Sequence, residues 1–148
     1  MKTQFQVNTE WTEQVDVVTA TADVSNFIDS RDFEPERKKR ELANAAPKLV
    51  RAVQYGYLSF GTDGSVIQHF RDPLTDVGQT KIVLSHITYV ARVKAEVKTA
   101  TIKTLQPHTV MNQIMEYAMM YTGQPEIILS KLDGYDADLM NTITPLFF

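Results

Sequence analysis

Residues 57–70 read Tyr57-Leu58-Ser59-Phe60-Gly61-Thr62-Asp63-Gly64-Ser65-Val66-Ile67-Gln68-His69-Phe70, the pattern of a β-hairpin. Two runs with aromatic and β-branched residues flank a short polar segment, and such runs favour strands. Asp63 and Gly64 tolerate the positive φ angles that a tight turn requires. The Asp72-Pro73 pair predicts the end of the second strand, because proline cannot donate to a strand ladder.

A third strand is predicted after the loop at Gly78. Residues from Ile82 to Val93 include many β-branched and aromatic side chains, so we expect a strand at about 82–93. With the hairpin at about 57–70 it would form a small antiparallel sheet. Residues 94–105 fit either a strand or a helix, and we favour a strand.

Helical patterns precede the hairpin. Glu34-Pro35-Glu36 places acids and a proline where a helix begins, because the first turn favours negative charge and needs no N–H. Pro47 predicts a kink or a second short helix that begins there. Gly56 lies where a C-terminal cap belongs.

The first 32 residues are expected to be extended or poorly ordered. Val15, Val17 and Val18 have β-propensity, and we predict an extended or flexible N-terminal arm over 1–32. Its anchors would be Phe27, Ile28 and Phe33. Deletion of residues 1–26 is then expected to leave the fold intact.

The sequence of the C-terminal third predicts helices. Pro107 opens a helix that runs to about Thr122 and stops at Gly123, and Pro125 begins a short second helix. Asp136 is expected to cap a last helix, whose end Pro145 would kink or fray. The fold class is therefore α+β: a single domain over 33–148 with a small antiparallel sheet, an N-terminal helix and a C-terminal helical bundle over 107–148.

The helix at 107–122 is apolar around most of its circumference. A small chain can hardly cover such a helix on every side, so we expect part of it to meet another molecule. A methionine-rich surface suits this role because methionine repacks easily, although the same stripe fits an ordinary core equally well. The predicted partner-binding residues are Val110, Met111, Ile114, Met115, Met119, Leu139, Met140, Ile143 and Phe147.

Composition is that of a globular protein. The chain has 148 residues, of which 43% are hydrophobic and 22% charged, with a net charge of −3. No run of about 18 apolar residues is present, and the first residues lack the apolar core of a signal peptide. We expect a soluble intracellular protein with no membrane partner.

The charge pattern argues against a nucleic-acid partner. The one dense basic run, at 37–40, is flanked by Glu34, Glu36 and Glu41 and has no interleaved aromatic residue. Its expected role is a solvated helix face. The acidic ends of the chain and its basic centre are interpreted first as internal complementarity, and second as a surface for a charged partner.

No catalytic or cofactor motif is found in the sequence. The chain has no cysteine, and His69, His86 and His108 form no paired metal-binding motif. The glycines form no phosphate-binding loop. The acids at 133–138 lack the spacing of a calcium loop and are expected to cap helices. We therefore predict no enzyme activity, no cofactor and no metal.

The last 85 or so residues resemble the tail assembly chaperones of long-tailed bacteriophages. The order is strand, Asp-Pro turn, strand ending in an arginine (Arg92), amphipathic helix and short terminal helices. The motifs that carry the likeness are Tyr121-Thr122-Gly123-Gln124-Pro125-Glu126, Leu129-Ser130-Lys131-Leu132-Asp133, Tyr135-Asp136-Ala137-Asp138-Leu139 and Phe147-Phe148. The N-terminal 55 residues lie outside the pattern.

This resemblance implies a viral assembly factor without catalysis. Such proteins coat the tape-measure protein, and some recruit tail-tube subunits, in the host cytoplasm before the tail is built. The expected partners are other phage structural or assembly proteins and further copies of the chain. Alternatives are a structural virion protein of the tail, neck, connector or capsid, a small enzyme with a scattered site, and a nucleic-acid binder.

Overall fold

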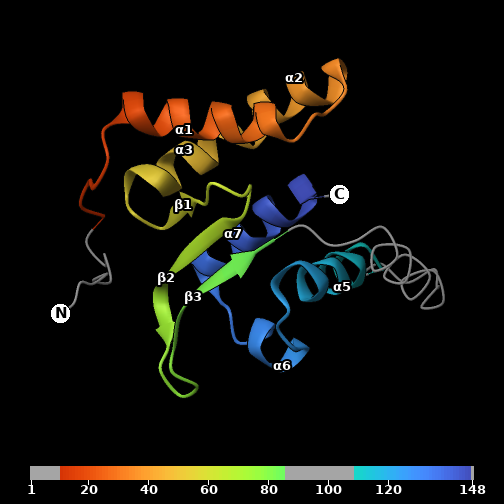
Figure 1. The fold of residues 1–148 in the computed structure, drawn as a ribbon. Coiled ribbons are helices and arrows are strands. Elements are labelled where there is room, and N and C mark those ends of the chain that lie inside the picture. The colour runs from red at the N-terminus through yellow and green to blue at the C-terminus, as the bar shows by residue number, and fades with distance from the viewer. Residues whose placement is uncertain (1–10, 86–108, 148) are drawn as a thin grey trace.

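The computed structural model describes residues 11–85 and 109–147. For residues 109–113 only the backbone is described; for the other residues in these ranges the side chains are described too. In this part of the chain six α-helices and one 3₁₀ helix surround a three-stranded sheet (Figure 1). In chain order the elements are α1 (Val17–Ser30), α2 (Pro35–Asn44), α3 (Ala46–Gln54), β1 (Leu58–Phe60), β2 (Val66–Leu74), β3 (Gln79–Leu84), α5 (Thr109–Thr122), α6 (Glu126–Leu129), α7 (Gly134–Ile143) and η1 (Thr144–Phe147). The predicted α+β class is confirmed.

The hairpin forms where the sequence predicts it. β1 pairs antiparallel with β2, with Ser59 opposite Ile67. Gly64 has a φ of +86°, which glycine adopts without steric strain. The Asp63 carboxylate accepts hydrogen bonds from the backbone N–H (3.1 Å) and the hydroxyl (2.6 Å) of Ser65. Local turn chemistry therefore fixes this element.

The second strand runs further than predicted. β2 extends through the Asp72-Pro73 pair to Leu74, so the prediction of a strand end there was wrong. The register with β3 shifts between His69 and Leu74, and proline is tolerated at such an irregularity. β3 begins earlier than the predicted 82–93 strand, and the part of that prediction beyond residue 85 lies outside the described residues.

The predicted extended arm is wrong for residues 17–30, which form α1. The Asp16 carboxylate accepts a 3.0 Å hydrogen bond from the backbone N–H of Thr19 and so caps the helix. The buried side chains recur at helical spacing on the face that packs against α3; they are Ala20, Val24, Phe27 and Ile28. Burial on that face outweighs the β-propensity of the flanking valines.

The helices before the sheet follow the prolines. α2 begins at Pro35 and α3 has Pro47 in its first turn, which confirms the predicted second helix. α3 buries Leu49, Ala52 and Val53, whereas no residue of α2 is buried. The N-terminal helices also contact the C-terminus, because the Arg31 guanidinium donates a 2.8 Å hydrogen bond to the carbonyl of Leu146.

Three helices and a 3₁₀ turn complete the chain, in agreement with the predicted C-terminal bundle (Figure 1). The prediction that Asp136 caps the last helix was wrong: Asp133 is the N-cap of α7, and Asp136 lies in the first turn of the helix. Pro145 lies in η1, where the α-helix has tightened to a 3₁₀ turn. The Tyr121 hydroxyl donates a 2.8 Å hydrogen bond to the carbonyl of Phe147, which joins η1 to α5.

Candidate functional site

Seven of the nine predicted partner-binding residues have described side chains, and these seven divide into two groups. Four of them are buried in the core of the chain, each at most 4% exposed; they are Leu139, Met140, Ile143 and Phe147. Leu139, Ile143 and Phe147 line no part of the groove described below, so their assignment to a partner surface was wrong. Ile114, Met115 and Met119 are half-buried on α5. The side chains of Val110 and Met111 lie outside the described residues.

The helix α5 is covered on one side by the rest of the chain. Tyr117, Ala118 and Tyr121 are buried, and the backbone N–H of Ser85, just after β3, donates a 2.9 Å hydrogen bond to the carbonyl of Tyr121. Ile114, Met115, Met119 and Met120 keep part of their surface exposed. α5 therefore presents a partly open apolar side.

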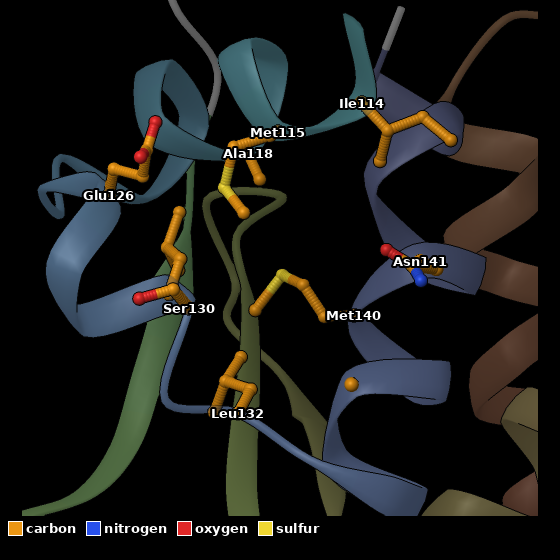
Figure 2. Close-up of a pocket in the computed structure, with 10 residues that line it drawn as sticks. Ile114, Met115, Ala118, Glu126, Ser130, Leu132, Met140 and Asn141 are labelled. Atoms are coloured by element: carbon orange, nitrogen blue, oxygen red, sulfur yellow. The ribbon is translucent and has the colours of Figure 1, made fainter. Parts of the chain in front are cut away.

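A groove of about 410 Å³ lies at the open side, between α5, α6 and α7 (Figure 2). The side chains of Met115 and Met140 extend from two of these helices into the space between them. The full lining is Ile114, Met115, Ala118, Glu126, Leu129, Ser130, Leu132, Ala137, Met140 and Asn141. The structure thus brings together three of the predicted residues, Ile114, Met115 and Met140, at one site.

The short helix α6 forms one wall of the groove. The sequence predicts this helix, but none of its residues was assigned to the binding site. Leu129 is 5% exposed and anchors this helix in the core. The connection to α5 turns at Gly123, whose φ is +70°, and the α6 segment is joined to the β2–β3 turn by the 2.7 Å Lys131–Asp76 ion pair. The sequence predicts the helix but carries no local signal for the neighbour against which it packs.

The wall formed by α7 is held by a buried carboxylate. Asp136 is 1% exposed, and its two oxygens accept hydrogen bonds from the backbone N–H groups of Arg71 (2.8 Å) and Asp72 (2.9 Å). The amide of Gln68 donates a 2.9 Å hydrogen bond to the carbonyl of Asp136. Burial raises the pKa of Asp136 above its usual range, against the opposing effect of the two N–H donors. These bonds fix α7 to β2.

An aromatic cluster at the start of the described chain also packs on α7. The ring of Trp11 meets the rings of Tyr57 and Tyr135 edge-to-face, at centroid distances of 5.3 and 4.9 Å. The Arg71 guanidinium lies 5.5 Å from the Trp11 ring centroid. Such ring pairs add stabilisation beyond the apolar area they bury. These contacts therefore help to position the helix that carries Met140.

The chemistry of the groove suits apolar contact. Its walls are aliphatic and thioether side chains, and its polar groups are the exposed Glu126, Ser130 and Asn141. Methionine side chains adapt to differently shaped partners. A volume of about 410 Å³ falls within the range of pockets that bury a small ligand or a few side chains.

The one described histidine has the environment of a weak base. His69 is half-buried on β2, and its Nε2 lies 3.3 Å from the Ser59 hydroxyl oxygen. Burial, with help from the neighbouring Lys81 cation, lowers the pKa of His69 to about 4. A general base is most effective with a pKa near the working pH, so this Ser–His pair is poorly suited to activate a nucleophile. His86 and His108 lie outside the described residues.

Two further classes of site were sought in the described ranges. Over residues 11–85 and 109–147, no three potential ligand side chains gather in a group that could hold a metal ion. Within the same ranges, no helix has both the length and the apolar character needed to cross a bilayer. Comparison of the chain with protein-family models, curated proteins and solved structures finds no match.

Proposed function

We propose that the chain is a non-enzymatic assembly factor that binds another protein through the groove between α5, α6 and α7. The observation that supports this role best is the meeting of Met115 and Met140 in one adaptable apolar groove (Figure 2). The resemblance of the C-terminal motifs to bacteriophage tail assembly chaperones suggests the partner class: a tape-measure or tail-tube protein, bound in the host cytoplasm.

The binding mode that we propose is a partner helix laid into the groove. An amphipathic helix presents apolar side chains at i, i+3, i+4 and i+7, and a groove between helices accepts such a row. Met115, Leu129 and Met140 would contact the apolar side chains. Glu126, Ser130 and Asn141 would contact the polar flanks, because they are exposed at the rim.

In the alternative role, a permanent virion protein would use an extended arm over residues 1–32 to dock on a neighbouring subunit. Residues 17–30 instead form α1, which packs against α3 of the same chain. This segment therefore gives the virion role no support. Mass spectrometry of purified particles separates the two roles: we expect the chain to be missing from mature particles, and stoichiometric retention would favour the virion protein.

A co-expression experiment tests the groove itself. Met115→Lys places a charge in the groove, and we expect it to abolish co-purification with the tape-measure protein of the same genome. Ile127→Lys is the matched control, because Ile127 lies on α6 but is 66% exposed and does not line the groove. If both variants retained the partner at the level of the unchanged chain, this binding site would be rejected. Circular dichroism checks that each variant is folded.

A further inference from the structure

A second hollow, of about 170 Å³, lies between α3 and α7. Its lining includes Lys48 and Arg51, which are three residues apart and share one face of α3. Tyr135 and Asp138 line it from α7 with the same spacing, and Trp11 lines it from the segment before α1. No residue of this hollow lines the groove between α5, α6 and α7, so α7 presents opposite faces to the two sites.

The groups that line this hollow are accessible from solution. The charged side chains Lys48, Arg51 and Asp138 are exposed. Trp11 is 37% exposed, and Tyr135 is half-buried. A ligand can therefore reach these groups without the displacement of a core side chain.

The two cations of α3 differ in their partners. Nζ of Lys48 lies 3.6 Å from Oδ2 of Asp138, across the space between the helices. In the ranges that the structure describes, no carboxylate lies within ion-pair distance of Arg51. The Glu13 carboxylate, on the segment before α1, instead accepts a 2.7 Å hydrogen bond from the side-chain amide of Gln54. With two cations and one acid, the lining has one positive charge in excess.

The phenol of Tyr135 adds a neutral hydrogen-bond donor near this charge. Burial raises the pKa of Tyr135 to about 12, although the Arg51 cation opposes the shift. The phenol therefore keeps its proton at neutral pH. Within the described part of the chain, its hydroxyl has no hydrogen-bond partner. A carboxylate that reached both Arg51 and Tyr135 would accept charge-assisted hydrogen bonds from each.

The indole of Trp11 forms an apolar wall next to Tyr135. The φ angle of Trp11 is +56°, in the left-handed region that bulky residues rarely adopt. Strain of this kind persists only where the surroundings hold it, and it is common at binding sites. The Trp11 ring meets the rings of Tyr55 and Tyr135 edge-to-face, at centroid distances of 5.4 and 4.9 Å. These contacts hold the wall in place beside the excess cation.

We propose that this hollow binds a glutamate side chain of a partner protein. The carboxylate would accept hydrogen bonds from the Arg51 guanidinium and the Tyr135 hydroxyl, while the methylene groups of the stem would contact the Trp11 ring. A volume of about 170 Å³ is close to the roughly 150 Å³ that holds one benzene ring, so it accepts a single side chain. Sites for free small molecules usually exceed about 300 Å³, which favours a group delivered by a protein segment.

The charges select an acidic ligand over a basic one. Aromatic walls alone would also suit a cation, which is attracted to the face of a ring. The Arg71 guanidinium already lies 5.5 Å from the Trp11 ring centroid, and Arg51 repels a second cation. A lysine side chain would therefore meet like charges in this hollow.

Peptide titration of the full chain tests the proposal. Trp11 is the only tryptophan, so its fluorescence reports binding at this site. The probes are capped alanine pentapeptides with a central glutamate, glutamine or lysine. We expect a saturable fluorescence change with the glutamate peptide, at least about threefold tighter than with the glutamine peptide and stronger still relative to lysine. No saturable change with the glutamate peptide, or equal affinities for glutamate and glutamine, would overturn the proposal.

Two arginine variants locate the binding site. Arg51→Gln should lower the affinity of the glutamate peptide to that of the glutamine peptide. Arg40→Gln is the matched control, because it makes the same charge change at an exposed arginine of α2 that does not line the hollow. Its affinity should stay that of the unchanged chain. Equal affinities for the two variants would overturn the assignment, and circular dichroism checks that both are folded.

A free acid distinguishes the source of the carboxylate. Butyrate carries the carboxylate and an apolar stem without a peptide, and we expect it to bind at least about twofold more weakly than the glutamate peptide. Equal or tighter binding of butyrate would replace the partner protein by a free small acid and overturn the assignment. The groove variant Met115→Lys should bind the glutamate peptide normally, so failure here is separable from failure of the proposed function.

Discussion

The carboxylate of Asp136 accepts a 2.8 Å hydrogen bond from the backbone N–H of Arg71. Sixty-five positions separate these residues, and the bond joins α7 to the part of β2 where the strand register is irregular. The N–H of Asp72 bonds to the second oxygen of the same carboxylate. One buried side chain thus satisfies two main-chain donors that the irregular ladder leaves unpaired, and it positions the helix that carries Met140.

Replacement of this carboxylate should weaken the fold. In Asp136→Asn the amide oxygen can accept one N–H, while the amide nitrogen faces the other N–H as a second donor. We expect the free energy of unfolding to fall by about 1–3 kcal/mol, measured by urea denaturation. Asp138→Asn is the control, because the Asp138 side chain is 63% exposed. The free energy of unfolding of this variant should equal that of the unchanged chain. Equal stability of the two variants would show that the Asp136 bonds contribute little.

The same residue predicts a pH dependence. Burial raises the folded-state pKa of Asp136, so the folded state binds this proton more readily than the unfolded state. The contribution of Asp136 to the free energy of unfolding is therefore fully present below the unfolded-state pKa. It declines as pH rises through the folded-state pKa. The stability difference between the unchanged chain and Asp136→Asn should shrink as pH increases above about 4. A difference that grows over this range would contradict the raised pKa.

Truncation of a core side chain on α1 should destabilise the chain. Ile28 is 0% exposed, and Ile28→Ala should lower the free energy of unfolding by about 2–5 kcal/mol through lost burial and a residual cavity. Val18→Ala on the same helix is the control: Val18 is 76% exposed, so the change should stay within about 0.5 kcal/mol. Thermal unfolding provides the comparison, and an unaffected Ile28→Ala would restore the interpretation of this segment as a dispensable arm.

The contact between α5 and η1 can be tested by removing one hydroxyl. Tyr121→Phe leaves the ring in place and removes the 2.8 Å hydrogen bond to the carbonyl of Phe147. The buried carbonyl then loses this donor, and we expect a loss of about 1–3 kcal/mol. Chemical denaturation measures it. A stability equal to that of the unchanged chain would mean that this hydrogen bond contributes little to holding the C-terminal turn.

Local signals explain which elements were predictable. The hairpin, the start of α2 and the break before α3 each follow from turn or capping residues within a few positions, and the structure places them as predicted. α1 was missed because its valines favour strand locally. The deciding fact, burial of Ala20 and Val24 against α3, depends on residues about 25 positions away.

Local signals also made part of the candidate site predictable, whereas the part that depends on packing was missed. Apolar periodicity identifies Met115 and Met140 as members of two helix faces. It cannot tell which face the fold covers, so Leu139, Ile143 and Phe147 were assigned to a partner although they lie in the core. The role of Asp136 was also missed, because an aspartate near a helix start is typical of a cap. Only the packing of α7 on β2 reveals its bonds to the strand.

The most direct measurement is methyl NMR of the chain labelled with ¹³C at the methionine methyl groups, titrated with the purified tape-measure protein of the same genome. The chain has six methionines, and Met→Leu variants assign their signals. Our account predicts that the Met115 and Met140 signals shift or broaden together on binding, because both side chains extend into the groove between α5, α6 and α7. A spectrum in which these two signals stay unchanged at saturating partner would contradict it.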